Sequence, residues 1–382
     1  MNELQQELVQ QLQKFRLKEI DPFMEMDDEA EEFRMEIFHK LGALGFAGMT
    51  TDEAFDGMGL SYEDFSYALM ELSKSSVSYA VTISVSSMVQ AILKEFASET
   101  LQKNYLPALA RGEEIGAFCL SESGAGSDAA SLITRAQAVE GGYILNGSKM
   151  WITSGGIAST YIVMARTGEE GAKGITAFLV RSGTPGFSYG KKEKKMGWRI
   201  SPTRELLFQN VFVPNSHVVG LVGEGFKVAM AALDKGRITI GAIAVGLAEV
   251  SLDCALNYSL SRQQFKQAIF DFQGIQFMLA DMALEVEASK LLVLKAAENY
   301  DRQVPNQKLA CMAKLKATDT AMKVSTDAVQ ILGGVGYTRE YPVERYMRDA
   351  QVLQIVEGTN QIQKVVIARQ LKNQIQPKNA RA

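Results

Sequence analysis

Apolar positions in the first part of the chain recur at helical spacing. Leu8 and Leu12 lie one turn apart, and the helical segments that follow are separated by glycine-rich joints. At one joint, Ser61 and Asp64 have the spacing of a capping box, which predicts that a helix begins directly after Ser61. This pattern predicts a helical N-terminal domain over residues 1–112.

Residues 113–223 no longer show the helical spacing of apolar positions. Short runs of β-branched and aromatic residues there alternate with glycine and proline. Residues 161–164 and 175–180 are such runs, and both are typical of strands. Asn146 and Gly147 lie between two further runs and predict a hairpin turn. The segment therefore predicts a middle β domain, a small antiparallel barrel or sandwich.

Helical spacing returns after residue 223. Residues 215–304 contain no proline, which permits long uninterrupted helices. Apolar or small residues recur every three or four positions over 277–291 and 321–332. We therefore expect a bundle of four or more helices over residues 224–382, and an α+β multidomain protein overall.

Composition narrows the classes of function. The 382 residues are 47% apolar and 22% charged with a net charge of −4, as in a globular protein of two or three domains. No basic domain suggests a nucleic-acid partner, and we interpret the one basic cluster, residues 191–195, as a solvated loop. No apolar run reaches the ~18 residues of a membrane span. The N-terminus lacks a signal-peptide pattern, and the three cysteines fit a cytoplasmic protein.

Histidine and cysteine are too scarce for several kinds of catalytic site. Only His39 and His217 are present, and no pair of cysteines or histidines has metal-ligand spacing, so we expect no metal. A Gly-x-Ser-x-Gly nucleophile elbow is also absent. If the chain is an enzyme, its proton chemistry is expected to belong to a carboxylate.

Two segments of the β domain could bind a polar or planar ligand. Residues 124–129 match Gly-x-Gly-x-x-Ala, but a strand follows instead of the helix that a dinucleotide-binding βαβ unit requires. The loop could still hold a ligand, with the Ser121 and Ser127 hydroxyls nearby, or be a simple turn. Trp151, two residues before Thr153, could cover a planar cofactor or could belong to the core.

Two segments of the C-terminal region raise similar alternatives. Gln330 is followed by three glycines, which suit either a helix end or the close approach of a ligand or another chain. Glu357 precedes a helix that Thr359 could cap. A buried carboxylate at that loop would have a raised pKa and could act as a general base, whereas a surface glutamate is the alternative.

Together and in this order, these segments closely resemble the acyl-CoA dehydrogenase family of flavoproteins. Residues 233–237, 261–265 and 346–350 continue the resemblance, which covers essentially the whole chain. It implies an N-terminal helical domain, a middle β domain and a C-terminal four-helix bundle, with FAD between the last two. It also implies a homotetramer.

The resemblance implies roles for individual residues, with Ser127 assigned to both the cofactor and the substrate. The flavin contacts would be Phe118, Leu120, Ser121, Trp151 and Thr153. Contacts to the adenine-dinucleotide half, across a subunit boundary, would be Arg262, Phe265, Gln330 and Gly334, and Thr359 and Gln361 would complete the set. The acyl-CoA would be held by Ser127, Asp234, Arg237 and Gly358.

The implied reaction needs one side-chain base. Glu357 would remove the α-proton of the thioester while flavin N5 takes the β-hydride, giving a trans-2-enoyl-CoA within fatty-acid β-oxidation. Electrons would then pass to electron-transfer flavoprotein. Family members for long-chain or isovaleryl substrates carry the base at the position of Gly236. A glutamate at 357 therefore favours short- or medium-chain substrates, straight or branched.

Two other functions stay open at this stage: an acyl-CoA oxidase or other flavin oxidation on the same fold, and a non-catalytic FAD- or acyl-CoA-binding assembly partner. Three departures from the family pattern also stand out. Ser123 replaces a usual proline, Lys266 replaces a usual glycine and so puts the local turn in doubt, and residues 53–55 lack the usual Pro-Glu-Glu run.

Overall fold

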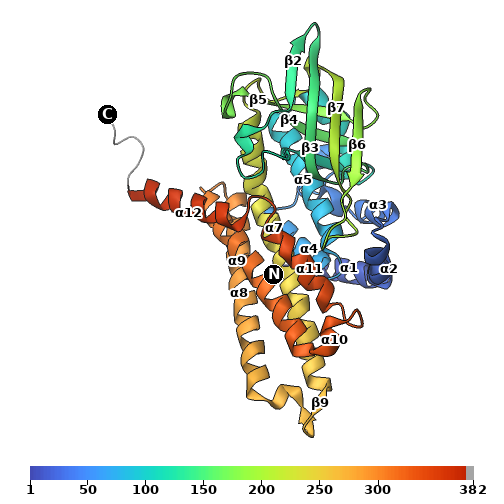
Figure 1. The fold of residues 1–382 in the computed structure, drawn as a ribbon, viewed down its shortest axis with the longest axis vertical. Coiled ribbons are helices and arrows are strands. Elements are labelled where there is room, and N and C mark those ends of the chain that lie inside the picture. The colour runs from blue at the N-terminus through green and yellow to red at the C-terminus, as the bar shows by residue number, and fades with distance from the viewer. Residues whose placement is uncertain (376–382) are drawn as a thin grey trace.

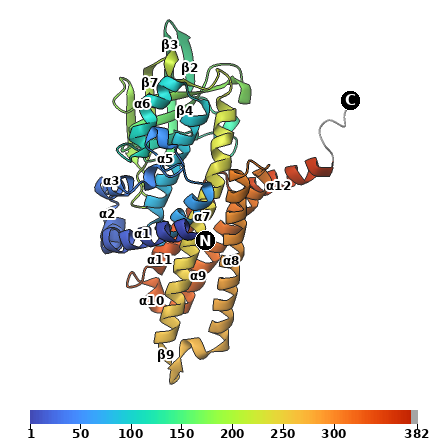
Figure 2. The ribbon, with the colours of Figure 1, turned by 180° about the vertical axis from the view of Figure 1, so that it is seen from behind.

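The computed structural model describes residues 1–375. It is elongated, with a β-sheet at one end, long helices running to the other end, and the N-terminal helices packed at the junction (Figures 1 and 2). The three-part α+β organisation predicted from the sequence is confirmed. The N-terminal helices are α1 (Glu3–Glu19), α2 (Met24–Ala30), α3 (Met35–Ala43), α4 (Tyr62–Ser73), α5 (Val77–Phe96) and α6 (Glu99–Ala110).

The predicted capping box at the start of α4 is present. The Asp64 N–H donates to Ser61 Oγ at 3.0 Å, and the Ser61 N–H donates to Asp64 Oδ2 at 3.2 Å. These two bonds satisfy backbone donors that the first helical turn cannot pair internally. The atypical residues Glu53–Phe55 form a short 3-10 turn with no buried residue.

The middle segment forms one mixed sheet of eight strands in the order β6-β7-β3-β2-β4-β5-β8, with β1 beside β4. Most strand pairs are antiparallel as expected, but β1 and β2 each pair with β4 in parallel. The β2–β3 hairpin lies between β1 and β4 in sequence, so the chain returns to β4 in the direction of β1. The strands are β1 (Gly116–Cys119), β2 (Arg135–Val139), β3 (Gly142–Thr153), β4 (Thr160–Arg166), β5 (Ile175–Arg181), β6 (Phe187–Lys192), β7 (Thr203–Pro214) and β8 (Val218–Val219).

The hairpin predicted at Asn146–Gly147 is also wrong. Both residues lie within β3, where the register against β7 shifts between Leu145 and Gly147, which marks a bulge. Gly147 has φ +140°, and a Cβ there would lie 2.8 Å from the Thr134 backbone, so the bulge needs glycine. The actual turn is at Gly141, between β2 and β3.

The C-terminal segment packs its long helices closely. An added Cβ at Gly246 of α7 would lie 2.0 Å from the Met70 carbonyl of α4, so the two helices touch through backbone. The helices are α7 (Gly225–Ser261), α8 (Gln273–Asp301), α9 (Gln307–Leu332), α10 (Gly334–Tyr337), α11 (Val343–Leu353) and α12 (Asn360–Ile375), with short strands β9 (Gln263–Gln264) and β10 (Gln267–Ala268) between α7 and α8.

Two helices, α5 and α7, are long and apolar enough to cross a membrane. However, 89% and 72% of their apolar windows are buried inside the protein, as expected of core helices. Helix α8 differs, because the apolar residues that predicted it face outward in the single chain. Phe277, Leu284 and Leu291 are 64%, 67% and 60% exposed. Within residues 1–375, this face of α8 therefore has no partner surface.

Candidate active site

Glu357 lies in the turn between α11 and α12, with its carboxylate turned into the protein. Burial raises the pKa of Glu357 to about 7, against the lowering effect of Arg237 and Lys314. Within residues 1–375, its buried Oε2 has no hydrogen-bond partner. A carboxylate with a pKa near neutrality and a free oxygen has the properties of a general base.

Gly236 of α7 faces this carboxylate directly. A Cβ at position 236 would lie 2.5 Å from Glu357 Oε2 and 2.7 Å from its Cδ, with Met88 Cε of α5 at 2.8 Å from the same point. In the family that the sequence resembles, the base lies at position 357 or at position 236. These two positions are therefore neighbours in space. Glycine at 236 leaves room for the Glu357 side chain, and Met88 makes its surroundings apolar.

Replacing Gly236 by alanine is expected to reduce turnover about a hundredfold, because the new methyl group displaces the carboxylate by about 1 Å. Gly274→Ala in α8 is the matched control, since an added Cβ there meets nothing within 4 Å. Both changes favour helix, so helix propensity cannot explain a loss confined to position 236. Steady-state rates of the two variants measure the effect, and equal rates would contradict the steric role of Gly236.

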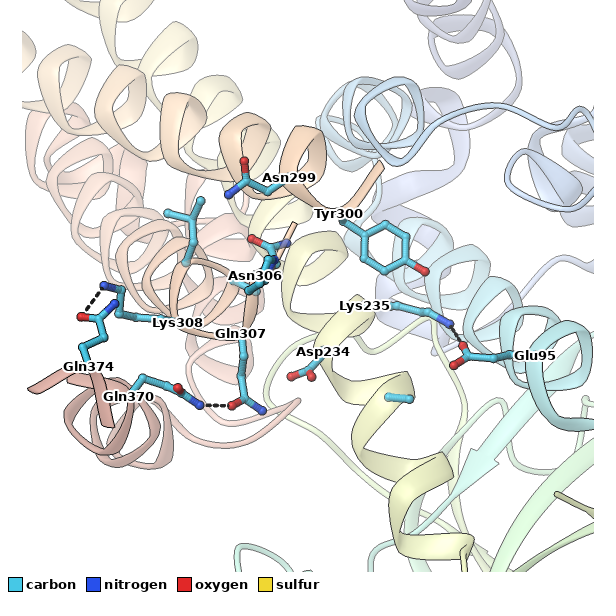
Figure 3. A pocket seen from close by; sticks show the side chains of 14 residues that line it. Glu95, Asp234, Lys235, Asn299, Tyr300, Asn306, Gln307, Lys308, Gln370 and Gln374 are labelled. Carbon is cyan, nitrogen blue, oxygen red and sulfur yellow. Dashed lines mark hydrogen bonds and ion pairs between the residues drawn. The ribbon is translucent and has the colours of Figure 1, made fainter. Parts of the chain in front are cut away.

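A cavity of about 810 Å³, with many polar side chains in its lining, lies beside α7 (Figure 3). Asp234 and Lys235 line it from α7, and Lys235 Nζ lies 2.6 Å from Glu95 Oε2 of α5. Asp234 forms an ion pair with the buried Arg237, whose Nε has no hydrogen-bond partner within the described residues. Burial also raises the pKa of Asp234. The cavity therefore lies beside the segment of α7 that directly precedes Gly236.

The residues predicted to contact flavin lie on two adjoining segments. The Met150 N–H donates to the Ser121 carbonyl at 2.9 Å, which joins the end of β3 to the chain after β1. Trp151 is 53% exposed and has φ +57°, a left-handed conformation that is rare for a large side chain. The fold therefore presents an indole face to the surface, with the partly exposed Thr153 two residues along.

The other predicted contacts on these two segments differ in their exposure to solvent. Phe118 is half-buried and Leu120 is buried, whereas Ser127 lies exposed on the glycine loop. A Cβ added at Gly124 or Gly126 of that loop would meet nothing within 4 Å. The loop leads into β2 instead of a long helix, which agrees with the rejection of a dinucleotide-binding βαβ unit. Ser123 lies exposed in the same turn, where no proline is required.

The residues predicted to contact the adenine-dinucleotide half of FAD lie away from the predicted flavin contacts within one chain. Arg262 and Phe265 lie at the β9 hairpin and Gln330 and Gly334 near α10, toward the end of the bundle remote from the sheet (Figure 1). Phe265 is 88% exposed. Phe265 and Lys266, with φ +50° and +70°, form the hairpin turn, so lysine occupies a backbone position that favours glycine.

Gly358 and Thr359 follow Glu357 in the turn that precedes α12. The Ile362 N–H donates to Thr359 Oγ1 at 3.3 Å, so Thr359 helps to cap the helix. Gln361 is exposed, and Gly358 follows Glu357 with φ +83°. The structure therefore joins Glu357, Gly358 and Thr359 in one turn.

Comparison with known proteins identifies this arrangement. Models of the acyl-CoA dehydrogenase N-terminal, middle and C-terminal domains match residues 2–113, 117–211 and 223–372. The chain belongs to the acyl-CoA dehydrogenase family. It is 45% identical to an acyl-CoA dehydrogenase of Bacillus subtilis, over 94% of this chain and 95% of the other.

Solved structures of similar proteins agree. Butyryl-CoA dehydrogenase from Megasphaera elsdenii is 42% identical, with a TM-score of 0.95 over 97% of this chain and 98% of the other. A chain from work on the electron transferring flavoprotein of Acidaminococcus fermentans is 43% identical, with a TM-score of 0.96 over 97% and 98%. This acyl-CoA dehydrogenase is an oxidoreductase, as the sequence predicted, and its family is flavin-dependent.

The residues of this acyl-CoA dehydrogenase fit a flavin on chemical grounds. An exposed indole in a strained backbone conformation offers a ring face, and strain of this kind typically marks a functional site. Within residues 1–375, the Ser121 and Thr153 hydroxyls form no hydrogen bonds and are free for a polar ring edge. The segments around Trp151 would therefore hold the isoalloxazine ring.

Sequence reasoning missed two buried lysines, one beside the predicted flavin contacts and one beside the Glu357 turn. Lys149 Nζ donates to the Leu120 carbonyl at 3.1 Å and to Glu122 Oε1 at 2.7 Å. Lys149 and nearby Ile133 hold the pKa of Glu122 below its usual value although burial opposes this. A lysine in a strand is usually exposed, so the sequence carries no signal for this pair.

The second missed lysine, Lys314 of α9, did have a sequence signal. It falls four residues after Ala310 and three before Ala317, on the face of small buried residues along α9. A charged residue on such a face is unusual and deserves a structural explanation.

Proposed function

We propose that this acyl-CoA dehydrogenase catalyses FAD-dependent α,β-dehydrogenation of a short- or medium-chain acyl-CoA, straight or branched, within fatty-acid β-oxidation. The observation that carries the proposal is the buried, unpartnered Glu357 carboxylate, whose pKa burial raises to about 7. Glu357 takes the α-proton of the thioester. Bound FAD would supply the two-electron acceptor for the β-hydride, and the product is the trans-2-enoyl-CoA.

The Glu357 turn also offers a donor for the thioester oxygen. Within residues 1–375 the Glu357 backbone N–H has no hydrogen-bond acceptor. Removal of the α-proton builds negative charge on the thioester oxygen, and a backbone N–H near that oxygen stabilises the charge. Glu357 could therefore remove the α-proton with its carboxylate and donate its backbone N–H to the thioester oxygen of the same enolate.

The CoA portion is proposed to enter through the cavity beside α7. Asp234 lines that cavity. The other residues proposed to hold the acyl-CoA are Arg237 and Gly358, near Glu357, and Ser127 on the glycine loop. Glutamate at 357 and glycine at 236, together with the similarity to a butyryl-CoA dehydrogenase, support short substrates. They do not distinguish straight from branched chains.

A homotetramer is proposed as the active form. The exposed apolar face of α8 needs a partner surface. Arg262 and Phe265 lie beside β9, and Gln330 and Gly334 lie at or beside α10, at the end of the bundle away from the sheet. A second subunit would therefore supply the adenine-dinucleotide contacts. Electron-transfer flavoprotein is the proposed acceptor, supported by the similarity to the chain from Acidaminococcus. A cytoplasmic location is also proposed and agrees with three unpaired cysteines.

One experiment tests this function. The purified protein is mixed without oxygen with butyryl-, isobutyryl-, octanoyl- and palmitoyl-CoA, and flavin absorbance is followed. We expect bleaching, fastest with a substrate of four to eight carbons. Peroxide formed in air as fast as substrate is consumed would favour an oxidase instead. A colourless protein, or a yellow protein that none of these substrates bleaches, would favour the assembly-partner alternative.

A further inference from the structure

A fully buried lysine lies directly against the Glu357 turn. Lys314 has no solvent exposure, and its Nζ donates to the Gly358 carbonyl at 3.1 Å and to Asn360 Oδ1 at 2.7 Å. Within residues 1–375, no carboxylate lies within 4.0 Å of this Nζ. Burying an ammonium without an ion-pair partner costs free energy. We therefore expect the role of Lys314 to lie in its hydrogen bonds to the Glu357 turn and to Asn360.

The turn that Lys314 contacts is intrinsically unfavourable. Glu357 and Gly358 have φ +57° and +83°, and a left-handed conformation costs a non-glycine residue about 1 kcal/mol or more. Gln363 Nε2 donates to the Glu357 carbonyl at 3.0 Å and to the Gly358 carbonyl at 2.8 Å. Lys314 adds a donor from a different helix, so the turn is fixed relative to α9 and not only to its own helix α12.

Asn360 extends the same network to a second point on α9. Its Nδ2 donates to Asp319 Oδ1 at 2.7 Å and to Thr318 Oγ1 at 2.9 Å. Its Oδ1 is thereby oriented toward Lys314. The first residue of α12 and the residue after the base are both held by one face of α9, which fixes the backbone from which the Glu357 side chain projects.

The charges around Glu357 come from two helices. Helix α7 contributes Arg237 and its ion-pair partner Asp234, and α9 contributes Lys314 and, behind it, Asp319. Cys311 of α9 lies near Lys314, and Met88 of α5 places an apolar group beside Glu357. Burial raises the pKa of Glu357, and Arg237 and Lys314 both lower it. Arg237 is paired with Asp234, whereas Lys314 has no ion-pair partner in the described chain.

We propose that Lys314 is a positioning residue for the dehydrogenation: its ammonium holds the Glu357–Gly358 turn against α9 and favours the ionised, proton-accepting form of Glu357. The inference rests on the proposed role of Glu357 as base. Lys314 donates to the Gly358 carbonyl and to Asn360 and not to the Glu357 carboxylate, so it acts through the turn and through its charge. Burial lowers the pKa of Lys314 to about 8, so it is charged in the neutral range where Glu357 must be ionised.

The test compares Lys314→Met with Lys316→Met, a change two residues along α9 at a partly exposed lysine that pairs with Glu285. The rate of flavin reduction by butyryl-CoA is measured from pH 6 to pH 9. In the wild type it should rise with pH through about 7, as Glu357 ionises. In Lys314→Met we expect about a tenfold lower rate at pH 7, a midpoint about one pH unit higher and a smaller deficit at pH 9. KM should change little, and Lys316→Met should match the wild type.

A second readout does not depend on activity. Hydrogen exchange of the backbone amides of residues 356–363, followed by mass spectrometry on the holoenzyme, should be faster in Lys314→Met and unchanged in Lys316→Met. If Lys314→Met does not fold, Lys314→Gln replaces it, because a neutral amide suits the polar site and the upward shift of the midpoint should persist.

The possible failures are distinguishable. If the wild type is reduced by butyryl-CoA and the Lys314 variant shows the same rate, pH midpoint and exchange, the positioning role is wrong while Glu357 keeps its role. If no acyl-CoA reduces the wild type, the proposed function fails. Exchange at residues 356–363 then still decides whether Lys314 holds the turn, and unchanged exchange would overturn the inference.

Discussion

Replacing Glu357 by glutamine is expected to abolish flavin reduction by acyl-CoA, with a loss on the order of a thousandfold or more, because an amide cannot accept the α-proton. The shape of the side chain is kept, so flavin content and the visible spectrum should stay as in the wild type. Stopped-flow absorbance with butyryl-CoA measures the effect. The control is Glu340→Gln, at an exposed glutamate before α11, which should retain full activity.

The same variant carries a second expectation, in stability. Because the pKa of Glu357 is raised from 4.5 to about 7 in the folded protein, the folded state binds this proton more tightly than the unfolded state does. The cost of ionising the buried carboxylate is absent below about pH 4.5 and fully present above about pH 7. Glu357→Gln should therefore melt higher than the wild type at pH 8 and much closer to it at pH 5. A variant with full activity and an unchanged melting temperature would exclude Glu357 as a buried base.

Replacing Lys149 by methionine is expected to destabilise the protein by about 3–5 kcal/mol, because it leaves the Glu122 carboxylate buried without its cation. Both side chains are buried, and the pair also fixes the Leu120 carbonyl beside the predicted flavin contacts. Flavin affinity should therefore fall along with stability. Urea denaturation and the flavin absorbance of the purified protein measure the two effects.

Two further variants separate the charge from the packing. Lys149→Met combined with Glu122→Gln removes both charges and should recover most of the lost stability, because no uncompensated ion remains. Lys191→Met changes an exposed lysine of β6 and should have little effect. A single Lys149 variant as stable as the wild type, with normal flavin content, would show that the pair does not support the site.

The secondary structure was largely predictable because local patterns dominated it. The capping box at Ser61, the proline-free interval and the helical recurrence of apolar residues each predicted elements that the structure contains. Strand pairing was less predictable. The Asn146–Gly147 dipeptide has the composition of a hairpin turn, but Thr134 packs so closely against Gly147 that the glycine serves a bulge within one long strand.

The sequence by itself determined the family, the three-part fold and the position of the base candidate, because these follow from motif order, periodicity and residue type. Only the tertiary structure decided the electrostatics. Burial raises the pKa of Glu357, and the approach of Gly236, Arg237 and Lys314 depends on how α7 and α9 pack. The tertiary structure also places the predicted apolar stripe of α8 on the surface. Periodicity shows that a helix has an apolar face, but what covers that face depends on contacts between residues far apart in the chain.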